Sequence, residues 1–407
     1  MKIGLFEDEK AHLAFLPITR TQPLWEIWWG IDRLIDKWKR YYGREVTALW
    51  PAHPLLYPLY PPQLPNFDGT QSQRDFLWIN TRLLPWSPEL NRILNALPPQ
   101  SAYVYENQLL AVRGMPPLMR GFRWIPQSLE ASHTLLPWPN ETPPHCLHTI
   151  TDFFQYNGQV IEADWKYLSA RSASLPPHPA IRGKDNIYLS EGAQVDWAFI
   201  DAADGPLYIG PGAHIQDAAI VGHHNAIGPQ TTVTSGTKLR THNSLGPLCK
   251  VGGEIGQSTF LGFSNKVHEG FVGHSVIGRW CNIGAGSNTS NLKNTYGSVR
   301  LYDIATGELK DTGLQFCGLI MGDYARCGIQ TAFTTGCVVD MGANVVGTGF
   351  TPKYIPPFYW AAGEVWDLEG FLRMVRRVKS RRKHEMSAEE VQMITGLYEA
   401  LVGERDG

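Results

Sequence analysis

The chain of 407 residues lacks several features that would place it in a class at once. Its formal net charge is only −2, so no general electrostatic attraction to nucleic acid is expected. Six cysteines form no CxxC pair, which argues against a zinc finger or a disulfide framework. No apolar run reaches the length of a membrane span, and three acids at 7–9 interrupt any signal-peptide pattern. We therefore expect a cytoplasmic protein with no nucleic-acid partner, no membrane and no bound metal.

What the sequence does have is a repeat of six residues, a period that neither a helix nor a pleated strand produces. A coil with three flat faces produces it, because each face supplies one inward aliphatic residue and about 18 residues make a rung. Rungs stack about 4.8 Å apart through parallel strand pairing. The uninterrupted run is Ile209, Ile215, Val221, Ile227, Val233, Leu239, Leu245, Val251.

The repeat continues after two slips in its spacing. The later positions are Ile255, Leu261, Val267, then Phe271, Ile277, Ile283, and finally Met321, Cys327, Phe333, Val339, Val345. Residues 287–316 interrupt the period, and we expect a long projecting loop there. The pattern predicts a parallel β-helix at 180–355, in which the small apolar residues Cys281, Cys327 and Cys337 are buried.

The remaining parts of the chain carry no six-residue period. Residues 1–170 predict an α/β domain, with strands at 2–6, 76–80 and 103–112, a turn at Glu106–Asn107 and a helix at 23–42. The proline-containing stretch 174–180 reads as an extended joint. Residues 356–407 predict a helical tail whose basic run we interpret as a solvated face, with nucleic-acid binding as the alternative. That run is Arg373, Arg376, Arg377, Lys379, Arg381, Arg382, Lys383.

Chemistry is expected where the repeat slips, because side chains are redirected there. His268 precedes the second slip. Imidazoles in general can act as a general base and take a proton from an amine. Asn282 and Asn291 offer amide donors and acceptors for sugar hydroxyls or a phosphate. A surface histidine and ordinary turn asparagines are the alternative interpretation of the same residues.

The segment 266–294, KVHEGFVGHSVIGRWCNIGAGSNTSNLKN, resembles the acetyltransferase half of the bifunctional N-acetylglucosamine-1-phosphate uridylyltransferase/glucosamine-1-phosphate acetyltransferase family. The whole chain more specifically resembles the alternate bacterial form of that family, through FLPITRTQP, NLKNTYG and DTGLQFCGLIMGD. The resemblance implies that His268 is the catalytic base. It implies that Ile329 and Gly347 contact acetyl-CoA. Substrate-binding roles fall on Lys250, Lys266, Asn282, Asn291 and Lys293.

The resemblance further implies a left-handed β-helix that forms a homotrimer with its site between subunits. The activity implied is acetyl transfer from acetyl-CoA to an amino-sugar phosphate such as glucosamine-1-phosphate. Two features depart from the family: Phe271 stands where the family has a tyrosine, and the loop at 287–316 is an insertion. Lys238, Arg240 and Lys250 are candidates for binding the sugar phosphate.

The N-terminal half lacks the glycine-rich loop that nucleotidylyltransferases of this family place after the first strand. No glycine occurs between Gly4 and Gly30, and the acids 7–9 at the end of the strand would repel a triphosphate. We expect a degenerate nucleotidylyltransferase-like domain, in which Arg20 contacts a phosphate or forms a surface ion pair. Mg²⁺ is required only if this half is active.

Three other functions fit parts of the sequence. One is sugar-1-phosphate nucleotidylyl transfer by the N-terminal half. Another is a metal enzyme of the β-helix carbonic anhydrase type, for which His223, His224 and His242 are the candidate ligands. The last is a β-helix scaffold without catalytic activity.

Overall fold

The computed structural model describes residues 2–43, 45–64, 76–87, 89–114, 129, 132–168, 180–361 and 363–403. The chain divides into two compact units. Unit 1 comprises residues 1–15, 19–27 and 33–149, and unit 2 comprises residues 16–18, 28–32 and 150–407. Of the predicted joint at 174–180, only the last residue lies within the described ranges.

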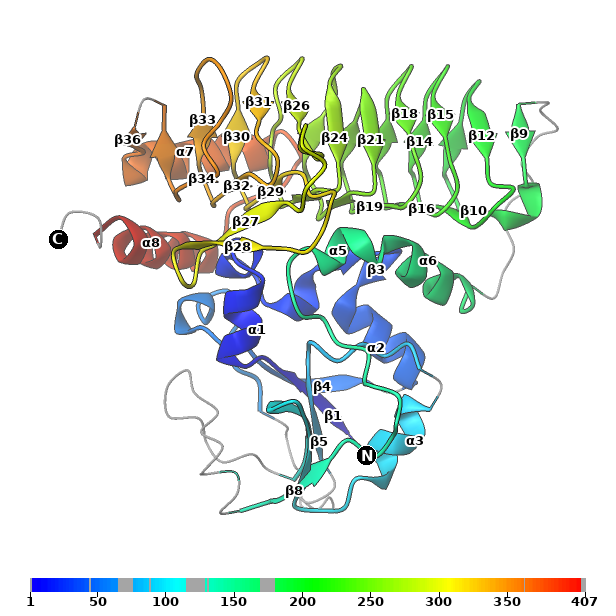
Figure 1. The fold of residues 1–407 in the computed structure, drawn as a ribbon, viewed down its shortest axis with the longest axis vertical. Coiled ribbons are helices and arrows are strands. Elements are labelled where there is room, and N and C mark those ends of the chain that lie inside the picture. The colour runs from blue at the N-terminus through cyan, green and yellow to red at the C-terminus, as the bar shows by residue number, and fades with distance from the viewer. Residues whose placement is uncertain are drawn as a thin grey trace. The chain divides into compact units, whose positions relative to one another are not determined.

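Unit 1 contains a six-stranded mixed sheet in the order β4-β1-β5-β7-β6-β8 (Figure 1). The strands are β1 (Ile3–Phe6), β4 (Val46–Trp50), β5 (Leu77–Asn80), β6 (Ser101–Tyr105), β7 (Gln108–Arg113) and β8 (Thr134–Pro137). β1 pairs in parallel with β4 and β5, and only β7 runs against its neighbours. The predicted turn is confirmed: Glu106 and Asn107 have φ angles of 46° and 60°, as a two-residue hairpin requires.

Among its described residues, unit 1 has the helices α1 (Glu9–Ala14), α2 (Leu34–Tyr42) and α3 (Leu90–Ala96). The prediction of one helix over residues 23–42 was wrong in its first half. There the chain forms a 3₁₀ turn (Leu24–Glu26) and the short strands β2 (Trp28–Trp29) and β3 (Asp32–Arg33). Gly30, with a φ of 70°, provides the left-handed turn between these strands. The indole of Trp29 is buried and donates to the Phe153 carbonyl and the Asn157 amide oxygen, both at 2.9 Å.

Unit 2 is a three-sided parallel β-helix, as predicted (Figure 1). Its first face is the sheet β10 (Ile187–Leu189), β13 (Leu207–Ile209), β16 (Asn225–Ile227), β19 (Asn243–Leu245), β22 (Thr259–Phe260), β25 (Val276–Ile277), β29 (Ile320–Met321), β32 (Val338–Val339) and β34 (Tyr354–Ile355). Its third face is the sheet β9 (Ile181–Arg182), β12 (Phe199–Asp201), β15 (Ile220–Val221), β18 (Lys238–Leu239), β21 (Glu254–Gly256) and β24 (Phe271–Gly273).

The second face carries most of the residues discussed below. It consists of β11 (Gln194–Val195), β14 (His214–Ile215), β17 (Thr232–Val233), β20 (Lys250–Val251) and β23 (Asn265–Lys266). Single parallel bridges from Asn265 to Asn282 and from Asn282 to Arg326 continue it. A last sheet, β30 (Arg326–Cys327), β33 (Asn344–Val345), β35 (Tyr359–Trp360) and β36 (Glu364–Val365), completes the face.

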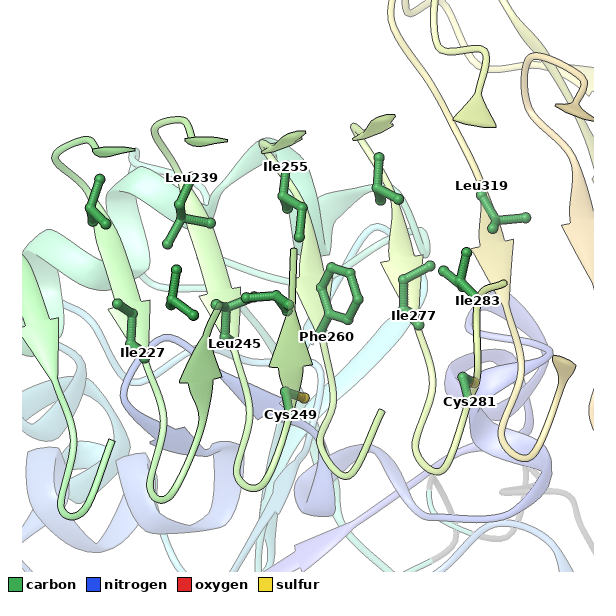
Figure 2. Packing of buried hydrophobic residues seen from close by; sticks show 14 of the residues in the cluster. Ile227, Leu239, Leu245, Cys249, Ile255, Phe260, Ile277, Cys281, Ile283 and Leu319 are labelled. Atoms are coloured by element: carbon green, nitrogen blue, oxygen red, sulfur yellow. The ribbon is translucent and has the colours of Figure 1, made fainter. Parts of the chain in front are cut away.

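Aliphatic side chains fill the interior of the β-helix, as Figure 2 shows for the middle rungs. Every member of the uninterrupted run from Ile209 to Val251 belongs to this core, as do the five predicted positions from Met321 to Val345. The two slips move the core positions, because the rungs there have 15 to 17 residues: Lys238 pairs with Glu254, and Val251 pairs with Lys266. The core residues are therefore Phe260 and Val272 in place of the predicted Leu261 and Phe271.

The break in the period starts later than predicted. β26 (Asn288–Thr289) still pairs with β31 (Ala332–Phe333) and so belongs to a rung. The inserted segment then forms an antiparallel hairpin of β27 (Arg300–Asp303) and β28 (Glu308–Asp311). The predicted helical tail is present as α7 (Leu368–Ser380) and α8 (Ala388–Gly403). Helices α5 (Asp152–Gln155) and α6 (Asn157–Trp165) also belong to unit 2.

Candidate functional site

His268 lies in the corner between β23 and β24, beside the shortened rung. Its side chain is exposed, and within the described ranges its imidazole makes no hydrogen bond. The corner is closely packed, because a Cβ on Gly252 would lie 1.8 Å from the Val267 carbonyl oxygen. Gly270, with a φ of 124°, ends the corner against the Ser287 carbonyl. The histidine is thus exposed on a backbone that has little room to move.

Lys266 explains how this corner is held. It pairs with the core residue Val251, so its side chain points into the β-helix where the repeat requires an aliphatic residue. The side chain is fully buried, and its ammonium donates to the carbonyl oxygens of His268 and, at 3.1 Å, Glu269. Burial lowers the pKa of this ammonium, while the Glu269 carboxylate acts in the opposite direction. The lysine that the resemblance assigned to substrate binding therefore braces the backbone that carries His268.

Asn282 follows on the outer side of the second face. It is bridged to Asn265 on one rung and to Arg326 on the next, and Cys327 beside Arg326 points into the core. Since neighbouring residues of parallel strands point the same way, all three polar side chains lie on the outer surface. The Asn282 amide has no hydrogen-bond partner within the part of the chain that the structure describes.

Asn291 occupies a different corner. Its amide nitrogen lies 2.9 Å from His274 Nδ1, and the ring of His274 stacks on Phe316 at 5.0 Å between centroids. Burial lowers the pKa of His274 to about 4, which keeps the ring neutral at neutral pH. No contact joins Asn291 to His268 among the described residues. Nothing in the local sequence signals the pairing of Asn291 with His274, and it was not predicted.

The other predicted residues are spread along the β-helix. Lys250 is exposed on the outer side of β20, and the Lys293 ammonium donates to the Ser298 carbonyl at 2.8 Å within the inserted segment. Ile329 is 70% exposed. Gly347 lines a cavity of about 210 Å³ together with the exposed Phe350. Ile329 and Gly347, the residues predicted to contact acetyl-CoA, thus each lie where apolar side chains are exposed.

In unit 1 the acids at the end of β1 have structural partners. The buried carboxylate of Glu7 accepts hydrogen bonds from the backbone N–H groups of Leu24 and, at 3.3 Å, Ala52. Burial raises its pKa to about 8, against the effect of these hydrogen bonds. Asp8 caps α1 through the Ala11 N–H at 2.7 Å. Because burial favours the neutral form of Glu7, the predicted repulsion of a triphosphate is reduced at that one of the three acids.

Arg20 lies close to two histidines that the sequence did not single out. The rings of His12 and His53 stack with centroids 4.8 Å apart. Burial, and secondarily the neighbouring charges that include Arg20, lower the pKa of His12 to about 3. Burial and then Arg20 lower the pKa of His53 to about 4. The result is a cation beside two neutral imidazoles.

A cavity of about 470 Å³ lies beyond the carboxyl ends of β5 and β8 in unit 1. Leu84, Leu90, Trp138, Asn140 and His145 are among the residues that line it. This volume and a mainly apolar lining with a few polar groups are typical of sites for small molecules.

The three histidines considered as metal ligands do come together in unit 2. The rings of His224 and His242 stack at 4.8 Å, and His223 Nδ1 lies 2.6 Å from His224 Nδ1. His224 Nε2 lies 2.7 Å from a carboxylate oxygen of Glu162. Among the residues that the structure describes, however, no group of three or more His, Cys, Asp or Glu is placed to hold a metal ion. The contacts are those of a hydrogen-bonded cluster.

None of the helices within the described ranges combines the length and the apolar character needed to cross a bilayer. The six cysteines are all buried and unpaired.

Comparison with known proteins supports the family resemblance. Residues 3–173 match the family model described as sugar nucleotidyl transferase. The bifunctional protein GlmU of Bartonella quintana (strain Toulouse) is 23% identical over 212 residues, 49% of this chain and 41% of the relative. GlmU of Methanocaldococcus jannaschii is 32% identical over 100 residues, 22% of this chain and 23% of the relative. The chain thus spans about two fifths and about a quarter of the lengths of these relatives.

Among solved structures, the polySia specific acetyltransferase NeuO is 13% identical, with 45% of this chain and 87% of that chain covered and a TM-score of 0.23. That score carries no argument about function. The family match of residues 3–173 and the GlmU relatives support the resemblance at family level, at low sequence identity.

Proposed function

We propose that the β-helix transfers an acetyl group from acetyl-CoA to the amine of an amino-sugar phosphate such as glucosamine-1-phosphate. The observation that carries the proposal is the corner at His268: an exposed imidazole with no hydrogen-bond partner among the described residues, on backbone braced from inside by Lys266. A rigid support for a free imidazole is what general base catalysis requires. The similarity to GlmU proteins supports the choice of reaction.

In the proposed reaction, His268 takes a proton from the sugar amine while the nitrogen attacks the thioester carbonyl. A C–N bond forms, the C–S bond breaks, and the proton passes to the leaving CoA thiolate. A backbone N–H at a rung corner stabilises the oxyanion, a contribution of about 3 kcal/mol per donor in other enzymes. The amides of Asn282 and Asn291 orient the sugar, in keeping with the unpartnered amide of Asn282.

The proposal includes a homotrimer, because one chain does not bring His268 and Asn291 into contact among its described residues. Neighbouring subunits complete the site in this arrangement. The exposed apolar side chains Ile329, Val346 and Phe350 support contact with acetyl-CoA or with a second subunit, since large exposed apolar groups that cluster mark binding surfaces.

The test is acetyl-CoA consumption with glucosamine-1-phosphate, measured for the wild type, His268→Ala and His214→Ala. A general base contributes about 10²- to 10⁴-fold to the rate, so His268→Ala should lose activity by that factor. His214 is the matched control, because it lies on the same β-helix and is paired with Asp196 at 2.6 Å. Equal turnover of the wild type and His268→Ala rejects the assignment.

A second activity, sugar-1-phosphate nucleotidylyl transfer by unit 1, is favoured by the family match of residues 3–173 and by the cavity of about 470 Å³. Glu7 and Asp8, which follow β1, do not fit a Mg²⁺ site. Both oxygens of Asp8 have partners, Ala11 and Asn80, and Glu7 is buried against backbone N–H groups. Arg20 is then the residue that contacts the nucleotide phosphate. Lack of pyrophosphate release over a panel of nucleoside triphosphates and sugar phosphates rejects this activity.

A further inference from the structure

Three arginines gather on the outer side of the second face, close enough for their charges to interact. Arg326 stands at the start of β30, and Arg381 and Arg382 follow the end of α7. Within the described part of the chain, none of the three forms an ion pair. Two acids of the same unit pair elsewhere: Asp323 binds Arg279 at 2.9 Å, and Glu390 binds Lys379. The cluster therefore keeps its positive charge.

The tail is held on the β-helix by specific contacts. Trp280 stacks on Phe263 with centroids 4.2 Å apart, and the ring of His384 meets both edge-on. The Lys379 ammonium lies 5.3 Å from the centre of the Trp280 ring. Arg382 donates to the Asn265 amide oxygen at 2.5 Å. The end of the basic run is thus docked on the β-helix, whereas the sequence had suggested a solvated face for all of it.

The geometry brings these arginines to one strip of surface. Asn265, Asn282 and Arg326 are successive outer residues of the second face, each about 4.8 Å from the next. Arg382 reaches the strip at Asn265, and Arg326 closes it two rungs away. Asn282, whose amide has no partner among the described residues, lies between the two guanidinium groups.

The guanidinium of Arg326 is buried without an anion to balance its charge among the described residues. Its Nε is buried and has no hydrogen-bond partner in the described structure. Burial, and secondarily the charge of Arg381, lower the pKa of the Arg326 guanidinium, and the same two effects act on Arg382. A buried charge is costly unless it is paired, and guanidinium groups match the oxygens of a phosphate in geometry and charge. A phosphate dianion on this strip would pair with the guanidinium groups of Arg326 and Arg382 at once.

We propose that Arg326, Arg381, Arg382 and Asn282 form a binding site for the phosphate group of a small phosphorylated ligand. The ligand is either CoA, through one of its phosphates, or the sugar phosphate. This choice rests on the proposed transferase function, whereas the phosphate site itself rests only on the arginine cluster.

The experiment measures binding to the full chain by titration calorimetry, with CoA, 3′-dephospho-CoA, glucosamine-1-phosphate and inorganic phosphate as separate probes. Arg326→Gln and Arg381→Gln each remove one cation; Arg381 is exposed, so its replacement leaves the fold intact. Loss of a charge-assisted hydrogen bond should weaken binding by about 10- to 100-fold. Arg376→Gln, an exposed change on α7, is the control and should bind like the wild type.

The probes separate the two sources. A loss of CoA binding that 3′-dephospho-CoA does not show assigns the site to the 3′-phosphate, and a loss confined to glucosamine-1-phosphate assigns it to the sugar. Equal binding by the wild type and both arginine variants overturns the proposal, as does equal weakening by Arg376→Gln. Arginine-dependent phosphate binding in a protein that transfers no acetyl group would reject the proposed function and leave this site standing.

Discussion

Replacement of Lys266 by methionine tests how the β-helix supports His268. Methionine fills a similar volume, so the change removes the ammonium and its bonds to two corner carbonyls while the interior stays packed. Each bond from a charged donor is worth about 1.5–3 kcal/mol. Removal of a buried ammonium relieves a desolvation cost of several kcal/mol, which is similar in size to the loss of the two bonds. The two effects nearly cancel.

We therefore expect Lys266→Met to change the free energy of unfolding at pH 7 by no more than about 1 kcal/mol, measured by urea titration. Acetyl transfer should fall by at least about 10-fold, because a small displacement of the catalytic group is costly. Lys184→Met, at an exposed lysine of the same unit, is the control for both measurements. Full activity in Lys266→Met would refute the bracing role. A loss of more than about 4 kcal/mol in the free energy of unfolding would show that the relieved desolvation does not offset the two lost hydrogen bonds.

The pH dependence of the same variant gives a second check. Burial lowers the pKa of Lys266 below its usual 10.5, so the unfolded chain holds this proton more tightly than the folded chain. The stability of the wild type should therefore rise with pH through the interval just below 10.5. Lys266→Met should lack that rise. If the free energy of unfolding changed with pH in the same way in the wild type and in Lys266→Met, the assignment of the rise to Lys266 would be wrong.

Two further predictions concern other buried groups. Trp29→Phe leaves the Asn157 amide oxygen and a backbone carbonyl without their indole donor, so unfolding should become easier by about 1–3 kcal/mol in a urea titration. His274, whose pKa burial lowers from 6.5 to about 4, binds its proton more tightly in the unfolded chain, so stability should be lost as the pH falls from 6.5 to about 4. His274→Phe should remove that part of the dependence, and an unchanged curve would contradict the assignment to this ring.

The interior of the β-helix could be predicted from the sequence because one period governs it. Every aliphatic residue from Ile209 to Val251 was placed correctly by counting in sixes. Counting failed at the slips, since a corner can lose residues while the strands stay paired. The 15-residue step from Val251 to Lys266 put a lysine where the count placed Val267. No periodic rule predicts a buried lysine, because its partners are backbone carbonyls of a corner that only the fold creates.

The other differences have the same origin in tertiary contacts. Residues 23–42 have the apolar spacing of a helix, yet Gly30 turns the chain so that Trp29 reaches its hydrogen-bond partners more than 120 residues away. The stacking of His12 on His53 and the docking of Arg382 on Asn265 likewise join distant segments. A single sequence carries no period or motif for such pairs.

The shortened rungs connect the proposed catalytic corner with the proposed phosphate site. In a β-helix with rungs of equal length, every corner has the same backbone geometry, so the corners differ only in their side chains. Between Val251 and Arg326 the rungs lose their regular length, which turns Lys266 inward and leaves His268 exposed at the corner. On the same rungs, Asn282 comes to lie between Arg326 and Asn265, and the tail docks at Asn265. Restoring an 18-residue rung by inserting three residues after Val251 should therefore abolish acetyl transfer and phosphate binding together, while the remaining rungs stay folded.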